Sequence, residues 1–459
     1  MIGRMKVFLL LLPLLAFDVK AYNYITCQNG LTLDFNGGDM TFNYGDNLSG
    51  NEKAALSLAF QRLTEFSDAT ITTVDNGDNS YFSGNSENEI YRDTAVSTAT
   101  CTYWFFSSTC EVAEADMQFG NQPWTTSDDS GHYPFGASRS LTGTGVHEGG
   151  HCVGMAHSAD SYNMMGADFS HVTRNGIAAY YGPGEDLSDG LIDLHGKRSG
   201  GLDSFRDVGI TVMRYTGASG EYSTHGFGAV RGFYGTTRPV VGSYVGQPMY
   251  RVGAGAATQM EITLENNGES DTETPNIGLY LSDNDIISSS DVFLGQVPSS
   301  LSRDNALETT VPVTIPAGTA PGNYFLGAYI DHDNLISETT VANNVAYYPV
   351  SIVSSAPTLT TEAASGITGT EATLNATVNP NGESSSLVFD YGLTGDYGSS
   401  ADFGNVGSGS TSLVVGEPVT GLTCETTYYY RPRGDSAAGT ALGTEGSFVT
   451  AACLPPGCD

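Results

Sequence analysis

The stretch HEGGHCVGMAH, from His147 to His157, constrains this 459-residue chain more than any other part of it. It fits the pattern H-E-x-x-H-x-x-G-x-x-H, which builds a catalytic zinc site from a few turns of backbone. On a helix, residues four apart share a face, so His147 and His151 present their imidazoles to one ion. Glu148 lies one position along, within reach of a water at the metal but outside the ligand set.

The third ligand, His157, requires the chain to turn back after the helix. Gly154 stands where a residue without a Cβ permits a left-handed reversal. Three histidines leave a fourth coordination position for water, which is typical of a catalytic rather than a structural zinc. The alternative is a helix that carries histidines for packing. Because the chain has only 8 His residues, a chance match to the whole pattern is a poor explanation.

The motif and its surroundings resemble the metzincin metallopeptidases. Beyond the third histidine, that family has a turn with a Met beneath the zinc, and YNMMG supplies Met165, with Met164 beside it. The pair His157-Ser158 is similar to the matrixin branch of the family. The residues that the resemblance places at the zinc are His147, His151 and His157 as ligands and Glu148 as the general base.

Residues upstream of the motif extend the resemblance. MTFNY (40–44) alternates like a first strand, and residues 48–66 place apolar side chains at helical spacing. Ser49, with Glu52 three residues later, is a capping-box signal for the start of that helix. ATITTVD (69–75) is rich in β-branched residues and predicts a second strand.

The segment CEVAEADMQFG (110–120) resembles the edge strand of the metzincins. In that family the edge strand holds an extended peptide by β-augmentation, so the resemblance implies a polypeptide substrate. By itself the segment predicts only a strand. Its position ahead of the histidine motif is what suggests a substrate-binding role for that strand.

The first 21 residues have the organisation of a secretory signal. Arg4 and Lys6 precede an apolar run, and VKA (19–21) resembles a cleavage site. The run is too short to span a membrane, and no later segment approaches about twenty apolar residues. A net charge of −33 argues against nucleic acid as a partner. We therefore expect a secreted protein without a membrane span.

The 7 Cys residues of an exported chain indicate disulfide bonds. Three pairings are open to the four in the motif region, which are Cys27, Cys101, Cys110 and Cys152. Since Cys101 and Cys110 flank the short, hairpin-like stretch CTYWFFSSTC, we expect that bridge and, by subtraction, one between Cys27 and Cys152. Cys152 adjoins a zinc ligand, but three histidines already fill the ligand set, so we expect it to be structural.

The chain changes character near residue 200, after KRSGG, which is typical of a linker. Beyond it, short alternating stretches and turn signals are typical of β-sandwiches. Residues 240–353, with YLSDNDIISSSDVFLG and GNYFLGAYIDHDNLISETTVANNV, resemble a bacterial Ig-like domain of the CARDB type. Residues 356–451 resemble a fibronectin type III domain, whose tyrosine corner matches LTCETTY (422–428). The resemblances imply cell-surface or polymer ligands for these modules.

Acidic residues in the first β-module are candidate Ca²⁺ ligands, because Ca²⁺ requires hard oxygen donors at short spacing. They are Asp283, Asp285, Asp331 and Asp333. The alternative is that these residues form turns and solvate loops.

These patterns predict a multi-domain chain, in which an α+β metzincin-like peptidase domain is followed by two all-β sandwiches, one Ig-like and one fibronectin-like. The expected segments are a signal peptide at 1–21, the peptidase domain at 22–200, a linker or start of the β region at 201–239, the CARDB-like sandwich at 240–353, the fibronectin type III-like sandwich at 356–451 and a tail with Cys and Pro at 452–459.

The function expected from these patterns is a secreted, Zn²⁺-dependent endopeptidase that cleaves extracellular proteins. Two alternatives are a surface adhesin that keeps a peptidase-like domain for binding only, and a zinc hydrolase acting on a non-peptide target. The intact Glu148 weighs against the adhesin, and the peptide-binding strand weighs against the non-peptide hydrolase. We expect the cleft to face away from the β-modules or to be open to solvent, and the modules to be dispensable for cleavage of small peptides.

Overall fold

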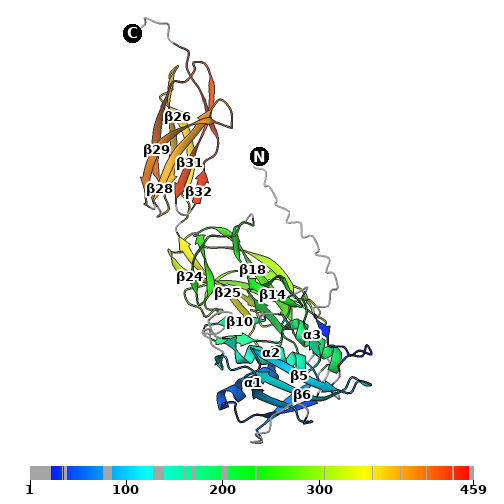
Figure 1. Cartoon of the computed structure of the whole chain (residues 1–459). Coiled ribbons are helices and arrows are strands. Elements are labelled where there is room, and N and C mark those ends of the chain that lie inside the picture. Colours follow the sequence, from blue (N-terminus) through cyan, green and yellow to red (C-terminus); the bar gives the residue numbers. More distant parts are fainter. Residues whose placement is uncertain are drawn as a thin grey trace.

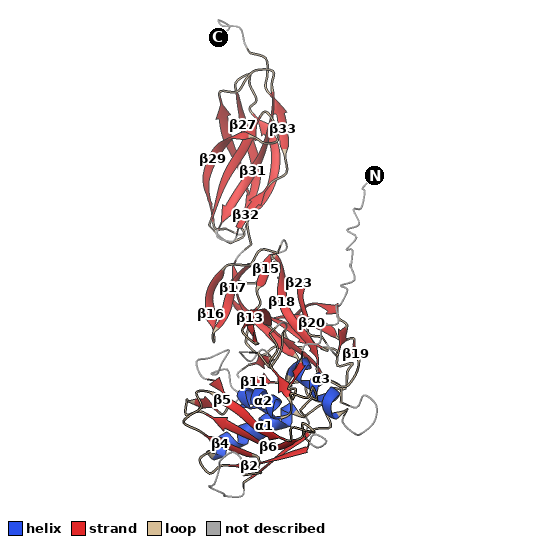
Figure 2. Ribbon diagram, turned by 45° about the vertical axis from the view of Figure 1, so that its right-hand side comes forward, coloured by secondary structure: helices blue, strands red, loops and turns tan. Residues whose placement is uncertain are grey.

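The structure is a computed structural model of the chain. It describes residues 22–33, 35, 39–75, 85–127, 139–159, 162–166, 171–176, 178–197, 205–232, 235–303, 305–353, 355–382, 384–409, 411–436 and 439–453. The expected signal peptide, residues 198–201 of KRSGG and Cys458 lie outside these ranges. Three units follow one another along the chain (Figure 1 and Figure 2). Within the described ranges, no helix is both long enough and apolar enough to cross a membrane.

Residues 22–197 form a unit built on one five-stranded sheet. The strand order is β3-β2-β4-β6-β5, with the first four strands parallel and β5 antiparallel to β6. The strands are β2 (Asp39–Tyr44), β3 (Thr70–Val74), β4 (Glu89–Arg92), β5 (Ala99–Phe105) and β6 (Val112–Phe119). The helices are α1 (Gly50–Leu63), α2 (Leu141–Cys152) and α3 (Gly184–His195). Three short pairs complete the unit: β1 (Asn23–Tyr24) with β9 (Met155–Ala156), β7 (Trp124–Thr125) with β8 (Arg139–Ser140), and β10 (Val172–Asn175) with β11 (Ala178–Tyr181).

Helix α1 begins at the capping box that the sequence predicts. The Ser49 hydroxyl accepts the Glu52 N–H, and the Glu52 carboxylate accepts the Ser49 N–H at 2.7 Å. The apolar face of the helix is buried in the core of the unit through Ala55, Leu56, Ala59, Phe60 and Leu63. The strands expected on either side of this helix are β2 and β3, with boundaries within one residue of those predicted.

The expectation that residues 110–120 form the edge strand is wrong. They contain β6, which lies between β4 and β5 inside the sheet. The edge strand on this side of the sheet is β5, seven residues that pair with β6 on one side only, and β3 is the other edge. Both segments have strand-forming sequences, and the order of strands in the sheet depends on tertiary pairing that the sequence pattern does not encode.

Residues 205–353 form a β-sandwich. One sheet contains β12 (Val208–Thr211), β15 (Val230–Gly232), β18 (Ala257–Asn266) and β23 (Leu307–Thr314). The other has the order β16-β17-β25-β24-β20-β21, with bounds β16 (Val240–Tyr244), β17 (Gln247–Gly253), β20 (Asn276–Ser282), β21 (Val292–Pro298), β24 (Gly322–Ile330) and β25 (Val345–Val353). Two further pairs are the hairpin β13 (Met213–Ser219) and β14 (Tyr222–Phe227), and β19 (Thr272–Glu273) with β22 (Leu301–Ser302). Much of the segment 201–239, expected as a linker or start of the β region, is therefore strand.

The first two units pack directly against each other. The Thr211 hydroxyl donates to the Val172 carbonyl at 2.7 Å, and Arg303 lies 3.2 Å from the buried carboxylate of Asp189. Met213, at the start of the β13–β14 hairpin, belongs to the hydrophobic core of the first unit. These contacts make the sandwich a neighbour of the first unit rather than a separate module on a linker.

Residues 356–453 form a second sandwich that extends away from the first two units (Figure 1). One sheet contains β26 (Thr358–Ser365), β27 (Glu371–Asn379) and β30 (Leu413–Thr420). The other contains β28 (Ser385–Gly392), β29 (Gly398–Gly407), β31 (Thr427–Ser436), β32 (Gly439–Leu442) and β33 (Gly446–Val449). The Tyr428 hydroxyl accepts the Thr423 N–H at 3.0 Å, at the corner predicted from LTCETTY.

Candidate metal centre

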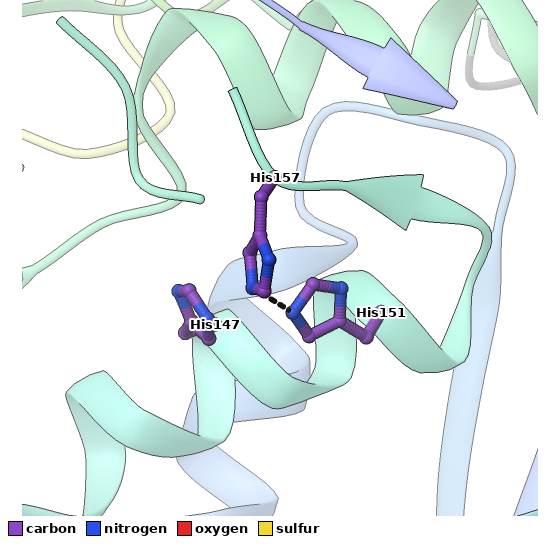
Figure 3. Close-up of side chains that lie close together, drawn as sticks. All are labelled: His147, His151 and His157. Atoms are coloured by element: carbon purple, nitrogen blue, oxygen red, sulfur yellow. Dashed lines mark hydrogen bonds between the residues drawn. The ribbon is translucent and has the colours of Figure 1, made fainter. Parts of the chain in front are cut away.

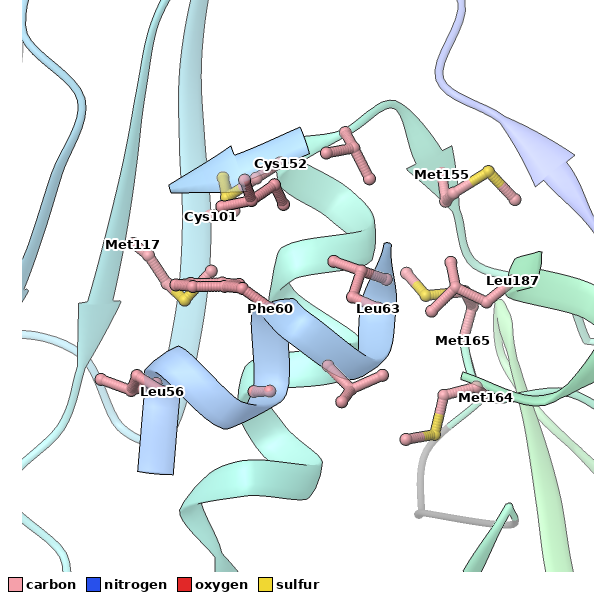
Figure 4. Packing of buried hydrophobic residues seen from close by; sticks show 14 of the residues in the cluster. Leu56, Phe60, Leu63, Cys101, Met117, Cys152, Met155, Met164, Met165 and Leu187 are labelled. Carbon is pink, nitrogen blue, oxygen red and sulfur yellow. A yellow bond between two sulfur atoms is a disulfide. The ribbon is translucent and has the colours of Figure 1, made fainter. Parts of the chain in front are cut away.

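Helix α2 presents the first two histidines of the motif. Its N-cap is Ser140, whose hydroxyl accepts the Gly143 N–H at 3.0 Å. The motif glycines allow close packing on two sides: a Cβ on Gly149 would lie 2.7 Å from Leu63 of α1, and one on Gly150 would lie 2.8 Å from the Met165 sulfur. Figure 4 shows this packing around α2. The small residues between the histidines therefore have a packing role.

The chain reverses after α2 as the sequence predicts. Gly154 has a φ of 97°, in the left-handed region that favours glycine. Strand β9 follows at once and brings His157 back over the helix, so that all three imidazoles meet (Figure 3). His151 Nε2 and His157 Nε2 are 2.8 Å apart, and one nitrogen from each of the three rings lies within 4.8 Å of the others.

Each of the three rings has an oxygen near its Nδ1 atom. His147 Nδ1 lies 2.9 Å from the Met164 carbonyl, and His151 Nδ1 lies 2.8 Å from the Met155 carbonyl. His157 Nδ1 lies 3.3 Å from a carboxylate oxygen of Glu221. A proton held at Nδ1 by these acceptors leaves the Nε2 lone pair of each ring for a cation.

Burial keeps these imidazoles neutral, which is the form that binds a metal. It lowers the pKa of His147 to about 4 and lowers the pKa of His151 well below its usual value. The pKa of His157 is also lowered by burial, against the opposing effect of Glu221. The donor set, its orientation and its protonation therefore fit a zinc ion.

Glu148 lies beside the histidines in a cleft of about 390 Å³. Burial raises the pKa of its carboxyl group to about 7, although a hydrogen bond from the Cys101 backbone N–H opposes this. Cys101 is in the edge strand β5, so this edge of the sheet positions the carboxylate. The cleft is lined by Ser97, Thr98, Ala99, Arg139, Thr144, His147, Glu148, Gly166 and Tyr222.

The two methionines of YNMMG have different positions. The Met165 side chain packs against α2 at Gly150, on the side of the helix that faces Leu187 (Figure 4). Met164 supplies the carbonyl that contacts His147, and its own N–H donates to Asp186 at 2.9 Å. The turn therefore supports the histidine cluster by packing and by backbone orientation.

Two residues at the site were missed by the sequence reasoning. Glu221 and Tyr222 come from the β13–β14 hairpin, and the Tyr222 ring centroid lies 3.9 Å from that of His157. The Ser223 N–H donates to the Ser158 carbonyl at 2.9 Å, which fixes the hairpin against the end of the motif. One wall of the cleft is thus supplied by Tyr222, from the segment 201–239 that was expected as a linker or start of the β region. No motif signals such a contact; the only sign in the sequence is the strand-like alternation after residue 207.

The expected pairing of Cys101 with Cys110 and of Cys27 with Cys152 is wrong. The disulfides are Cys27–Cys110 and Cys101–Cys152, with a third between Cys424 and Cys453. Cys101 is too far from Cys110, because several extended residues at about 3.3 Å each separate it from the tip of the β5–β6 hairpin. Its neighbour is instead the last turn of α2, so this bridge ties β5 to the residue after His151.

The acidic candidates for calcium lie in two loops, one after β20 and one after β24, and make protein contacts. Asp285 accepts the Tyr244 hydroxyl at 2.8 Å, and Asp331 accepts the backbone N–H groups of Leu335 and Ile336 at 3.0 Å. The carboxylates of the other two accept side-chain amides: Asp283 from Asn284 and Asp333 from Asn276. Among the described residues, two groups of His, Cys, Asp or Glu converge as metal ligands do, and neither includes these four.

A family model supports part of the β region. The CARDB family matches residues 244–347, inside the range expected from the sequence. No curated protein matches the chain. The chain thus contains a CARDB domain. The match does not extend to the histidine cluster, whose function must be argued from its own geometry.

The solved structures that match parts of the chain include the following three. The crystal structure of a CARDB domain from Pyrococcus furiosus, in complex with di-metal ions, is 18% identical, with 34% of this chain and 95% of that chain covered and a TM-score of 0.21. The sensor domain of the anti-sigma factor RsgI4 in Pseudobacteroides cellulosolvens is 19% identical, with 22% and 97% covered and a TM-score of 0.18. A segment of two fibronectin type III domains from chicken tenascin is 12% identical, with 43% and 94% covered and a TM-score of 0.21.

Proposed function

We propose that this chain is a secreted zinc endopeptidase, with a metzincin-like peptidase domain in its N-terminal unit. The observation that carries the proposal is the convergence of three neutral histidines beside a buried glutamate in a cleft. A packing role for the histidines does not account for three ring nitrogens aimed at one another with an oxygen behind each ring.

In this proposal His147, His151 and His157 hold the zinc. When bound, zinc supplies Lewis-acid activation of water and of the scissile carbonyl group. Glu148 takes the proton from the attacking water and passes it to the leaving amine nitrogen. The Cys101 N–H orients the Glu148 carboxylate for both transfers.

The edge strand β5 favours a polypeptide substrate. Strand β5 pairs with β6 on one side, and residues 97–99 at its start line the cleft beside Glu148. An extended peptide added along this edge would place a peptide bond near the carboxylate. We assign the substrate-binding role, expected of residues 110–120, to this strand.

Three disulfides in the described part of the chain support export, since such bonds form in oxidising compartments. The CARDB domain and the C-terminal sandwich would then bind cell-surface or polymer ligands. These modules also favour the second candidate function, an adhesin whose peptidase-like unit only binds.

Cleavage of casein and of a peptide library by the purified full-length chain tests the proposal. Chelation should abolish cleavage and Zn²⁺ should restore it. Glu148→Gln should keep the zinc but lower kcat/KM by about 10²–10⁴-fold, because the base is lost while the ligands remain. If zinc is bound and neither substrate is cleaved by the wild type or by Glu148→Gln, the endopeptidase proposal is overturned.

A further inference from the structure

A second group of metal-ligand residues is buried away from the first. His171 lies directly before β10, and Glu185 and Asp186 lie in the first turn of α3. One ligand atom from each of the three lies within 4.8 Å of the others. Their exposed fractions are 5%, 0% and 1%, so water does not solvate these groups.

One of the atoms that face the centre of this group has no partner. Glu185 Oε2 is buried without a hydrogen bond, whereas His171 Nε2 and Asp186 Oδ1 lie 3.0 Å apart, at ion-pair distance. Leaving a buried carboxylate oxygen unpaired is costly, and a cation held between the three side chains would satisfy it.

Each side chain uses its other polar atom for a contact that fixes its orientation. Glu185 Oε1 accepts the Ala306 N–H at 3.0 Å, Asp186 Oδ2 accepts the Met164 N–H at 2.9 Å, and His171 Nδ1 lies 2.7 Å from Glu265 Oε1. Metal-binding histidines and carboxylates are held in this way by neighbours outside the ligand set.

We propose that His171, Glu185 and Asp186 bind a second divalent transition-metal ion, of the zinc class, at the junction of the first two units. Imidazole with two carboxylates is a donor set that zinc accepts. Glu265 of β18 orients His171 from the sandwich side. Gly184 permits the site, because a Cβ there would lie 2.1 Å from His171 Nδ1.

An ion at this site would hold the sandwich and the first unit together. Asp186 holds the N–H of Met164, whose carbonyl contacts His147 of the first cluster. Glu265 and Ala306 belong to the sandwich, so the ion would link it to the turn beneath the first cluster.

Metal content of the full-length protein tests the proposal without any need for peptidase activity. In a His151→Ala/His157→Ala variant, which removes the first site, about one Zn²⁺ per chain should remain after equilibration with zinc and desalting. Adding Glu185→Gln to that variant should remove it. A matched control, Glu273→Gln, replaces a buried glutamate that pairs with Arg206 and should leave the metal in place.

Thermal unfolding of the same His151→Ala/His157→Ala variant gives a second measurement, which needs no change in the second cluster. Chelation should lower its Tm and Zn²⁺ should restore it. If the variant is folded, holds no metal and has the same Tm with and without chelator, the cluster is only an ion-pair network and the proposal is overturned. Metal retained in the Glu185→Gln variant would also overturn the ligand assignment.

Discussion

The ring of Tyr222 lies against the ring of His157, with centroids 3.9 Å apart, although 65 residues separate them in the sequence. The tyrosine belongs to the β13–β14 hairpin, within the segment 201–239 expected as a linker or start of the β region. Its neighbour Glu221 lies 3.3 Å from His157 Nδ1. Residues that precede the CARDB match therefore form one wall of the candidate metal centre. That wall does not come from residues 22–197, the unit that contains the histidine motif.

Glu221→Gln should weaken zinc binding at the first site. The carboxylate is the acceptor that orients His157, and loss of such a partner lowers metal affinity by about 10–100-fold. Because Glu221 is largely exposed, we expect the lower end of that range. Competition with a chromophoric chelator measures the affinity. Glu371→Gln, at an exposed position of the C-terminal sandwich, should have no effect, and an equal effect of the two substitutions would show that the contact is incidental.

Cys101→Ala/Cys152→Ala should lower both stability and cleavage. Removal of a disulfide costs about 2–5 kcal/mol of unfolding free energy. This bridge also joins the strand that positions Glu148 to the helix end that carries His151. Tm and kcat/KM for a small peptide measure the two effects. Cys424→Ala/Cys453→Ala should destabilise only the C-terminal sandwich, and a comparable loss of kcat/KM in that variant would contradict the assignment.

A chain ending at Val353 should cleave small peptides at a rate close to that of the full chain. The C-terminal sandwich extends away from the site (Figure 1). A chain ending at Gly200 should instead lose zinc affinity and cleavage, because it lacks Glu221, Tyr222 and the sandwich contacts of α3. This differs from the expectation drawn from the sequence. Full activity in a folded chain ending at Gly200 would restore that expectation.

The features that the sequence predicts correctly depend on short-range interactions, and those that it misses depend on residues far apart in the chain. The capping box at Ser49 and the reversal at Gly154 depend on neighbours within a few residues, so the sequence predicts them well. The CARDB domain was predictable from a long stretch of related sequence. By contrast, the partner of Cys101 depends on which strand lies against α2.

The residues of the candidate site also differ in whether local sequence or tertiary packing places them. Its histidines and Glu148 come from one local motif, and their convergence depends on a few turns of backbone. Tyr222 depends on how two units pack, and a tertiary contact of this kind leaves no periodic pattern in the sequence. The buried partners of His171 were missed for the same reason, since Glu265 reaches it from β18.

Asp207→Asn should stabilise the protein more at high pH than at low pH. Burial raises the pKa of Asp207 to about 8, although Asn267 and Asn343 donate to its carboxylate at 3.0 and 2.8 Å. An unfolded chain ionises an aspartate near pH ~4. The folded state therefore binds a proton that the unfolded state has lost, and its stability falls as pH rises between these values.

The asparagine cannot ionise and removes this dependence, so the Tm of Asp207→Asn minus that of the wild type should grow from about pH 5 to about pH 8. Comparison at each pH cancels the effect of the high net charge, which destabilises both proteins alike. Thermal unfolding followed by circular dichroism at several pH values measures the difference. A difference that stays constant, or that shrinks with rising pH, would show that Asp207 is already ionised in the folded protein.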